Sequence, residues 1–176
     1  MLKALIIYYS KTNTTKKFAD IIDKHISADT IRVEPVDKYP DGFFATCFVG
    51  GKQLLFGERP PIKNEMPDFR KYDTIFIGSP TWASRLSVPM KTFLEKSDLS
   101  GKKIAVFSTT NGPFGSGVYK DVVKLFPNSQ VLPNFLNLEN GKVDSSEDII
   151  VQWLQSNGFL DNQNTQASTE NKKDEL

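Results

Sequence analysis

The sequence predicts an α/β domain with a doubly wound, five-stranded parallel sheet and helices on both faces. Short apolar segments alternate about five times with segments whose apolar residues recur at helical spacing. The first of these segments, residues 4–9, is apolar throughout, which is typical of parallel strands buried on both faces. A length of 176 residues, 39% of them hydrophobic and 24% charged, suits one globular domain.

The first half of the chain is expected to fold as strand, helix and strand, followed by an irregular segment. Residues 2–9 predict the first strand. Residues 14–26 predict a helix, because their apolar residues fall on one face. Residues 30–34 alternate between polar and apolar and predict the second strand. The segment 36–73 is preceded by Pro35 and interrupted by four further prolines, and within it residues 43–56 predict a helix.

The second half repeats the pattern with three strands, each followed by a helix. The expected strands cover 74–78, 104–108 and 130–138, and the expected helices cover 88–96, 117–126 and 145–156. Residues 161–176 contain no aromatic residue and are mostly polar. We therefore expect residues 1–160 to form the domain and residues 161–176 to form a solvated, mobile tail.

Composition excludes several classes of function. With 22 basic and 21 acidic residues, bulk charge gives no reason to expect nucleic-acid binding. A single cysteine, Cys47, excludes an intramolecular disulfide, a cysteine zinc site and a C-x-x-C redox pair. A single histidine, His25, excludes a multi-histidine metal site. We expect no bound metal, and redox chemistry in this chain would require an organic cofactor.

Two short motifs that act only in the secretory route are expected to be inactive. Residues 173–176 spell an ER-retention signal, and residues 13–15 spell a glycosylation acceptor. Both act only in a chain that enters the secretory route, and we recognise no signal peptide. No apolar run approaches the roughly 20 residues of a membrane span. We expect a cytoplasmic protein without membrane association.

The loops after the first, third and fourth strands are the expected ligand site, because doubly wound sheets bind ligands beyond the carboxyl ends of their strands. The loop after the first strand carries hydroxyl side chains at Ser10, Thr12, Thr14 and Thr15. Free N–H groups at the start of the following helix would add donors for a phosphate. The loop lacks the glycines of nucleotide-binding fingerprints. The alternative is an ordinary helix cap rich in Ser and Thr.

The other two loops predict a flat ligand. After the third strand, Trp82 follows Gly-Ser-Pro-Thr, and its ring is expected to stack on a planar group. The alternatives are that Trp82 covers the sheet edge or stacks on Arg85. After the fourth strand, residues 108–117 contain three glycines that let a ligand approach the backbone. The alternative there is a plain flexible loop.

These three segments resemble the cofactor loops of flavodoxins and related FMN proteins, and the resemblance covers residues 2–158. Ser10, Thr12 and Thr15 match the family's phosphate loop, Thr/Ser-x-Thr-Gly-x-Thr. Asn13 stands where the family usually has Gly, and Asn tolerates a left-handed backbone. Thr110 stands where a Tyr often covers the flavin. No long insertion interrupts the last strand, so the chain resembles the short-chain type.

The resemblance implies a bound FMN, with its phosphate on residues 10–15. The isoalloxazine ring would lie between the 80–82 segment and the 109–115 loop. No catalytic side chain and no metal are implied. The implied cofactor-binding residues are Ser10, Lys11, Thr12, Asn13, Thr14, Thr15, Pro80, Thr81, Trp82, Ala83, Thr109, Thr110, Asn111, Gly112 and Gly115.

Three functions are consistent with this resemblance. The first is electron transfer through non-covalent FMN to a redox partner protein. The second is an NAD(P)H-dependent reductase that passes electrons to a small-molecule acceptor such as a quinone or a flavin. The third is a non-catalytic binding module that has lost FMN. Flavodoxins are typically acidic, and the near-neutral charge of this chain leaves room for small-molecule reduction. A monomer and a homodimer are both open.

Overall fold

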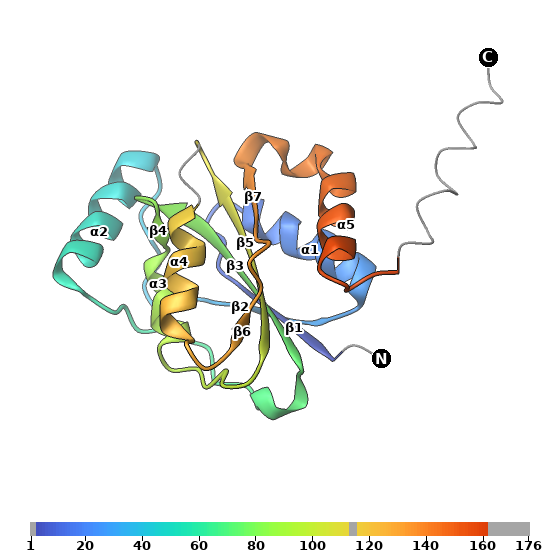
Figure 1. Ribbon diagram of the computed structural model, residues 1–176. Helices are drawn as coiled ribbons and strands as arrows, with labels where there is room; N and C mark the ends of the chain where they lie inside the picture. Colours follow the sequence, from blue (N-terminus) through green and yellow to red (C-terminus); the bar gives the residue numbers. More distant parts are fainter. Residues whose placement is uncertain (1–2, 113–115, 162–176) are drawn as a thin grey trace, which may run out of the picture.

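A parallel sheet with strand order β2-β1-β3-β5-β6 forms the centre of the computed structural model (Figure 1). The structure describes residues 3–112 and 116–161. The predicted tail therefore lies outside the described residues, apart from Asp161. The chain runs from β1 outward to β2 and then crosses to β3 on the other side of β1, which is the reversal of a doubly wound sheet. The five strands named here are β1 (Ala4–Tyr8), β2 (Asp29–Arg32), β3 (Thr74–Trp82), β5 (Lys103–Thr110) and β6 (Gln130–Val131).

The last strand of the sheet is broken into two, where the sequence predicts one strand over 130–138. β6 and β7 (Leu136–Glu139) both pair with β5 in parallel, with Pro133 between them. Proline offers no N–H to a strand ladder, so the break at this position has a direct cause.

The third strand is longer than its predicted range of 74–78, because β3 continues to Trp82. Beyond Pro80 it turns back through Ala83 and Ser84 and pairs antiparallel with the two-residue strand β4 (Arg85–Leu86). The prediction that Trp82 lies in a loop is therefore wrong: it lies at the end of a strand, in a hairpin.

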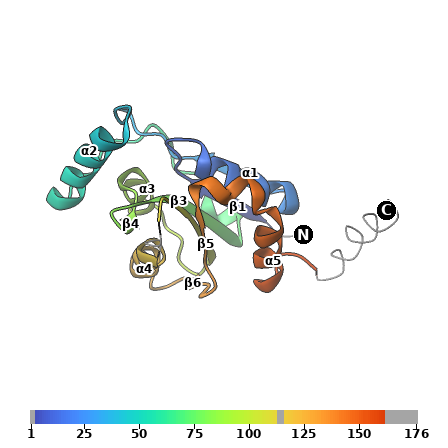
Figure 2. The same ribbon diagram turned by 90° about the horizontal axis from the view of Figure 1, so that it is seen from above.

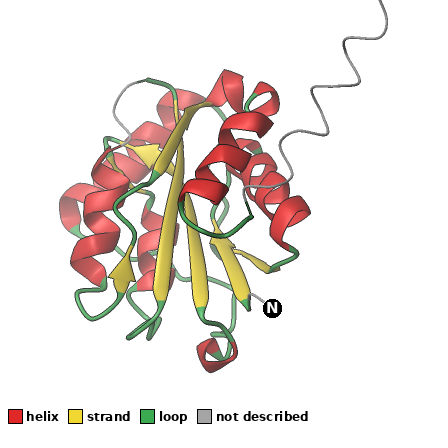
Figure 3. Ribbon diagram, turned by 45° about the vertical axis from the view of Figure 1, so that its right-hand side comes forward, coloured by secondary structure: helices red, strands yellow, loops and turns green. Residues whose placement is uncertain are grey.

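Helices cover both faces of the sheet, as predicted (Figures 2 and 3). One face packs against α1 and α5, and the other packs against α3 and α4. α2 contacts α3 and β3 at the end of the molecule that carries the β3–β4 hairpin. The helices are α1 (Thr14–Ile26), α2 (Phe43–Phe56), α3 (Val88–Leu94), α4 (Ser116–Leu125) and α5 (Glu147–Ser156), with short 3₁₀ turns η1 (Phe69–Lys71) and η2 (Asn140–Ser145).

The core consists of two layers that the strands separate. Along β1, Leu5 and Ile7 pack toward α3 and α4, whereas Ile6 and Tyr8 pack toward α1 and α5. All of β1 is buried, which confirms the prediction from its unbroken apolar run. Burial of each such side chain contributes about 1.5–3 kcal/mol. In the described residues, no helix has both the length and the hydrophobicity needed to cross a membrane.

Gly78 in β3 is required by the packing of Phe107. A Cβ added at Gly78 would lie 2.2 Å from Cζ of Phe107, whose ring packs on Phe18 with centroids 4.7 Å apart. We expect Gly78→Ala to lower the free energy of unfolding by about 1–3 kcal/mol, because a rigid core must shift to admit the methyl group. Urea denaturation measures this effect. The control is Gly141→Ala, where an added Cβ meets nothing within 4 Å; equal midpoints for the two variants would contradict the packing argument.

Candidate functional site

A cavity of about 580 Å³ lies where the carboxyl ends of β1, β3 and β5 meet α2. Its volume is within the range of small-molecule sites. Three of its walls come from the three loops that the sequence singled out. The predicted residues that line it are Lys11, Thr12, Thr15, Pro80, Thr81, Trp82, Ala83, Thr109, Thr110, Asn111 and Gly112.

The loop after β1 presents the start of α1 to this end of the sheet. Asn13 is the N-cap of α1 with φ +64°, which confirms that Asn takes the left-handed turn expected at this position. The side chain of Asn13 makes no capping bond, and the first backbone bond of the helix runs from Lys17 N to Asn13 O. The N–H groups of Thr14, Thr15 and Lys16 therefore precede the helical ladder, as in an anion site.

Ser10 and Thr15 give this loop buried hydroxyl groups. Ser10 is 3% exposed, and its Oγ is buried without a hydrogen-bond partner. Its carbonyl accepts a bond of 2.7 Å from Arg32. The hydroxyls of Thr15, in the first turn of α1, and Thr109, near the end of β5, lie 2.8 Å apart, so the start of α1 is joined directly to β5.

Trp82 lines the cavity from the β3–β4 hairpin. Its ring meets Tyr39 and Tyr9 edge-on, with centroids 4.8 and 5.7 Å away. Gly50 of α2 lies so close that an added Cβ would be 3.0 Å from the indole. Burial raises the pKa of Tyr9 to about 12, so the phenol stays neutral beside the indole. Arg85, the alternative stacking partner, is paired with Asp121 instead.

The end of β5 and the residues after it supply the third wall. β5 continues to Thr110, so Thr109 and Thr110 lie in a strand and not in the loop that the sequence predicted over residues 108–117. The hydroxyl of Thr110 accepts a bond of 3.2 Å from Gly112 N, and Asn140 of η2 donates to Asn111. The Oγ1 of Thr81 and the Oδ1 of Asn140 are buried without partners, and both residues line the cavity. An unpaired buried polar atom costs about 1–3 kcal/mol, which a ligand donor or acceptor would recover.

The described residues that line the cavity are almost all uncharged. Of its described lining residues, Lys11 alone is ionisable. Its ammonium donates to the Pro40 carbonyl at 2.6 Å and to the Thr46 hydroxyl. Among residues 3–112 and 116–161, no group of three or more metal-binding side chains is present. What the site can do is bind and orient a ligand.

The flavodoxin family model matches residues 49–157, more than half of the chain. The chain belongs to the flavodoxin family. A crystal structure of a flavoprotein in complex with FMN from Lactobacillus acidophilus NCFM is similar to it, with 26% identity and a TM-score of 0.67, covering 82% of this chain and 98% of that one.

A putative flavoprotein from Bacteroides uniformis ATCC 8492 shares the fold, with 23% identity and a TM-score of 0.70 over 88% of this chain and 98% of that one. A flavodoxin from the domain Archaea shares it at 15% identity and a TM-score of 0.56, over the same 88% and 98%. No curated protein matches the chain. At these identities, the two structures support the fold alone.

Not every predicted site residue of this flavodoxin lines the cavity. Ser10, Asn13 and Thr14 belong to the first loop but are not among the lining residues. Gly115 lies outside the described residues. With Thr110 at the place of the family's Tyr, the sequence offers Phe114 and Tyr119 as the nearby aromatic residues. Phe114 lies outside the described residues, and Tyr119 stacks on Phe135 with centroids 5.0 Å apart.

The sequence interpretation missed the wall that α2 forms, together with Ser84 and Asn140. The adjacent glycines in α2 were a usable signal, because glycine inside a helix usually marks a close approach. The missed lining residues are Gly42, Thr46, Gly50, Gly51, Leu54, Ser84 and Asn140.

The turn of the β3–β4 hairpin is strained and is held by α4. Ala83 and Ser84 have φ of +47° and +60°, which costs a residue with a Cβ roughly 1–2 kcal/mol. A Cβ added at Gly117 would lie 1.5 Å from the Ser84 carbonyl oxygen, so only glycine fits there. Asp121 accepts a bond of 2.6 Å from Arg85 and one of 3.0 Å from the Leu86 N–H.

Asp121→Asn is expected to destabilise the flavodoxin in a pH-dependent way. Burial by itself raises the pKa of Asp121, but the hydrogen bonds from Arg85 and Leu86 outweigh it and hold the pKa below its ordinary value. The stability that this carboxylate contributes is therefore present above about pH 4 and is lost as the pH falls through the lower pKa of the folded state.

At pH 7 we expect Asp121→Asn to lower the free energy of unfolding by about 1–2 kcal/mol. The effect is no larger because Arg85 is half exposed and solvent screens the pair. Denaturation midpoints between pH 7 and 3 measure it, and the gap between wild type and variant should narrow at the acid end. Asp20→Asn, in the exposed Lys16–Asp20 pair, is the control, with about 0.3–0.5 kcal/mol. Parallel curves for wild type and Asp121→Asn would show that the carboxylate does not hold the hairpin.

Proposed function

We propose that this flavodoxin binds FMN non-covalently and serves as an electron carrier. The observation that carries the proposal is the pairing of an open helix N-terminus with buried, partnerless polar atoms around one cavity. The L. acidophilus flavoprotein, described in complex with FMN, supports the same cofactor.

The first loop fits the phosphate of FMN. Its left-handed turn at Asn13 directs the free N–H groups of residues 14–16 to one side. Ser10 supplies a buried hydroxyl that lacks an acceptor or donor within the protein. Thr12 and Thr15 add hydroxyls on the cavity wall. These N–H and hydroxyl groups favour a dianionic ligand. No basic side chain is needed for this, since the ammonium of Lys11 is bound to Pro40 and Thr46.

The other walls fit the isoalloxazine ring. Residues 80–83 line the cavity from the β3–β4 hairpin, and residues 109–112 line it from the end of β5 and the residues after it. Trp82 offers an aromatic surface. Thr81 and Asn140 supply buried polar atoms for the polar edge of a ring. Gly112 lets a planar ligand approach the backbone. Gly115 belongs to this proposed set by its place in the sequence.

In this proposal the protein binds the FMN, orients its ring and shields it from water. When bound, FMN supplies the electron chemistry. Trp82 and the hairpin would hold the ring, and α2 would limit access of water from its side. Among the described lining residues Lys11 alone is ionisable, and its ammonium donates to Pro40 and Thr46. The described lining therefore suits binding and orienting a cofactor, which is what an electron carrier requires.

An NAD(P)H-dependent reductase of quinones or flavins is the second candidate. The observation in its favour is the charge balance of 22 basic and 21 acidic residues. Such a surface gives little long-range steering toward an oppositely charged partner protein. Small neutral acceptors do not need such steering.

Purified protein supplied with FMN separates these possibilities. A bound flavin gives absorption near roughly 370 and 450 nm, and heat releases it because it is not covalently attached. Protein that stays colourless with added FMN would overturn both redox functions and leave a binding module. Steady consumption of NADPH with a quinone would favour the reductase over the carrier.

Ser10→Ala tests the phosphate site. We expect the affinity for FMN to fall by about 10- to 100-fold, which is the value of one hydrogen bond to a charged group. The affinity for riboflavin, which lacks the phosphate, should not change. The stability of the FMN-free protein should stay equal or rise, because Ser10 Oγ has no partner to lose. Isothermal titration and thermal unfolding measure the two effects.

Ser156→Ala is the matched control, since that exposed hydroxyl bonds only within α5. It should change neither affinity. Equal FMN affinity in wild type and Ser10→Ala would place the phosphate elsewhere.

A further inference from the structure

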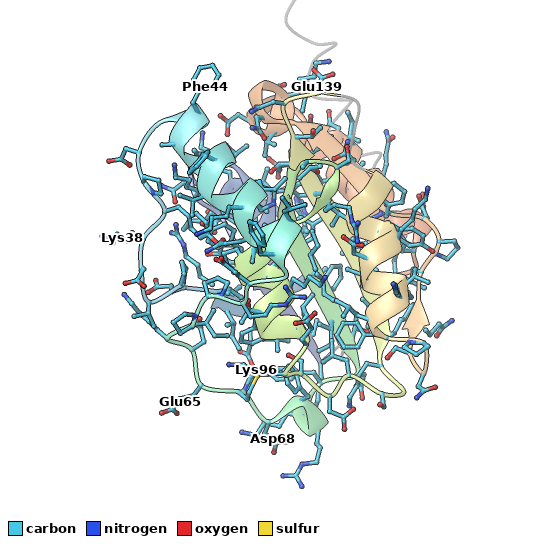
Figure 4. The ribbon with its side chains drawn as sticks, turned by 90° about the vertical axis from the view of Figure 1, so that its left-hand side faces the viewer. Lys38, Phe44, Glu65, Asp68, Lys96 and Glu139 are labelled. Atoms are coloured by element: carbon cyan, nitrogen blue, oxygen red, sulfur yellow. The ribbon has the colours of Figure 1, made fainter. Side chains whose placement is uncertain are left out.

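The outer face of α2 exposes large apolar side chains. Phe44, Phe48, Leu55 and Phe56 are 86%, 76%, 79% and 68% exposed. Figure 4 shows α2 on the surface, with Phe44 projecting from its first turn. The helix carries a single charged residue, Lys52, in its 14 residues. Soluble monomers rarely expose so large a contiguous apolar patch, which marks an interaction site.

The spacing of this patch is that of a helix-pairing stripe. Phe44, Phe48, Gly51 and Leu55 follow one another at intervals of four, three and four residues, the heptad spacing that faces a second helix. We call these four residues the α2 stripe. Phe56 lies beside it.

Gly51 in the middle of the stripe lines the cavity, but no close contact within the described residues requires a glycine there. Glycine inside a helix costs roughly 1 kcal/mol relative to alanine. The neighbouring Gly50 is accounted for, because an added Cβ would lie 3.0 Å from Trp82. An added Cβ at Gly51 meets nothing within 4 Å. A gap of this kind between two apolar side chains suits a large side chain from another helix.

We propose that two copies of this chain form a homodimer by packing their α2 stripes together, antiparallel across a two-fold axis that passes between Phe48 and Gly51. In this arrangement Phe48 of each copy fills the gap over Gly51 of the other, so the surface is complementary to itself. Of the monomer and the homodimer that the sequence leaves open, this proposal favours the homodimer.

The available area matches what such a dimer needs. Four largely exposed side chains contribute to the interface: the three large ones of the stripe, and Phe56 beside it. At about 150 Å² each, they bury about 600 Å² per copy. The pair then buries about 1,200 Å² in total, the lower end of the range for specific interfaces. The interface is small, so we expect dissociation in the micromolar range rather than an obligate dimer.

Charge favours a second copy over a membrane surface. A helix that lies on a membrane carries a polar face rich in Lys and Arg. The face of α2 opposite the stripe packs on Trp82 and lines the cavity through Thr46 and Gly50. The one charge of the helix, Lys52, lies 3.8 Å from Glu58. α2 therefore has no cationic face to hold anionic lipid.

The dimer would place α2 of one copy beside the cavity of the other. Gly51 belongs both to the stripe and to the cavity lining. A Phe48 ring seated over it would narrow the mouth of the neighbouring copy's site. The partner copy would thus contribute to both sites, although neither FMN binding nor electron transfer is needed for the dimer to form.

Analytical ultracentrifugation of the full chain between about 1 and 100 μM tests the dimer. Wild type should shift from monomer to dimer across this range. Phe48→Glu should raise the dissociation constant at least roughly 30-fold, as for an interface anchor. Phe48 is absent from the cavity lining, so the variant should still take up FMN, measured by titration of its absorption.

Gly51→Leu is the second variant, because leucine favours the helix but fills the gap. It should weaken the dimer by roughly 10-fold or more while leaving the helical circular dichroism intact. Ile149→Glu is the matched control: Ile149 is 48% exposed on α5, which covers the other face of the sheet. It should not change the dissociation constant.

Two outcomes would overturn the proposal. The first is a wild-type chain that is monomeric at 100 μM, whether or not it also sediments with phosphatidylcholine–phosphatidylglycerol vesicles; binding to vesicles would assign the stripe to a membrane surface. The second is a dimer whose dissociation constant is the same in wild type, Phe48→Glu and Gly51→Leu. Loss of FMN binding alone would leave the dimer standing.

Discussion

The reversal of chain direction beside β1 is the constraint on which the site depends. The chain leaves β1 for β2 on one side and later crosses to β3 on the other. The connections after β1 and β3 therefore diverge, and their backbone groups cannot pair with each other. The strands themselves are buried on both faces, so polar side chains gather at this edge. The hydroxyls of Ser10, Thr15 and Thr109 are there for that reason.

The cavity at the carboxyl ends of the strands keeps its shape because neighbouring elements hold the β3–β4 hairpin in place. The strained turn at Ala83 and Ser84 persists because α4 approaches through Gly117 and binds Arg85 and Leu86 through Asp121. Strain of this type concentrates at sites of function. The stable core thus supports a hairpin that would not take this shape alone.

The elements that local sequence patterns determine were predicted correctly. The elements whose conformation depends on tertiary contacts were missed. The buried strands, α1 and the left-handed Asn13 follow from apolar runs, helical spacing and the backbone tolerance of Asn. The β3–β4 hairpin does not, because Ala-Ser is not a hairpin turn sequence and its conformation depends on Gly117, 33 residues away. The fifth strand was predicted without its break, although Pro133 marked the place.

The wall formed by α2 was missed for a related reason. Its apolar residues surround the helix, so no single face indicates where the core lies. A helix that is apolar all round must have something to cover on each side. The inner side covers Trp82 and the cavity, which accounts for Gly50. The outer side carries a second glycine and three large apolar side chains at heptad spacing. In the proposed dimer, one rule explains the glycines on both faces of α2: a glycine between apolar neighbours lets another side chain approach the helix closely.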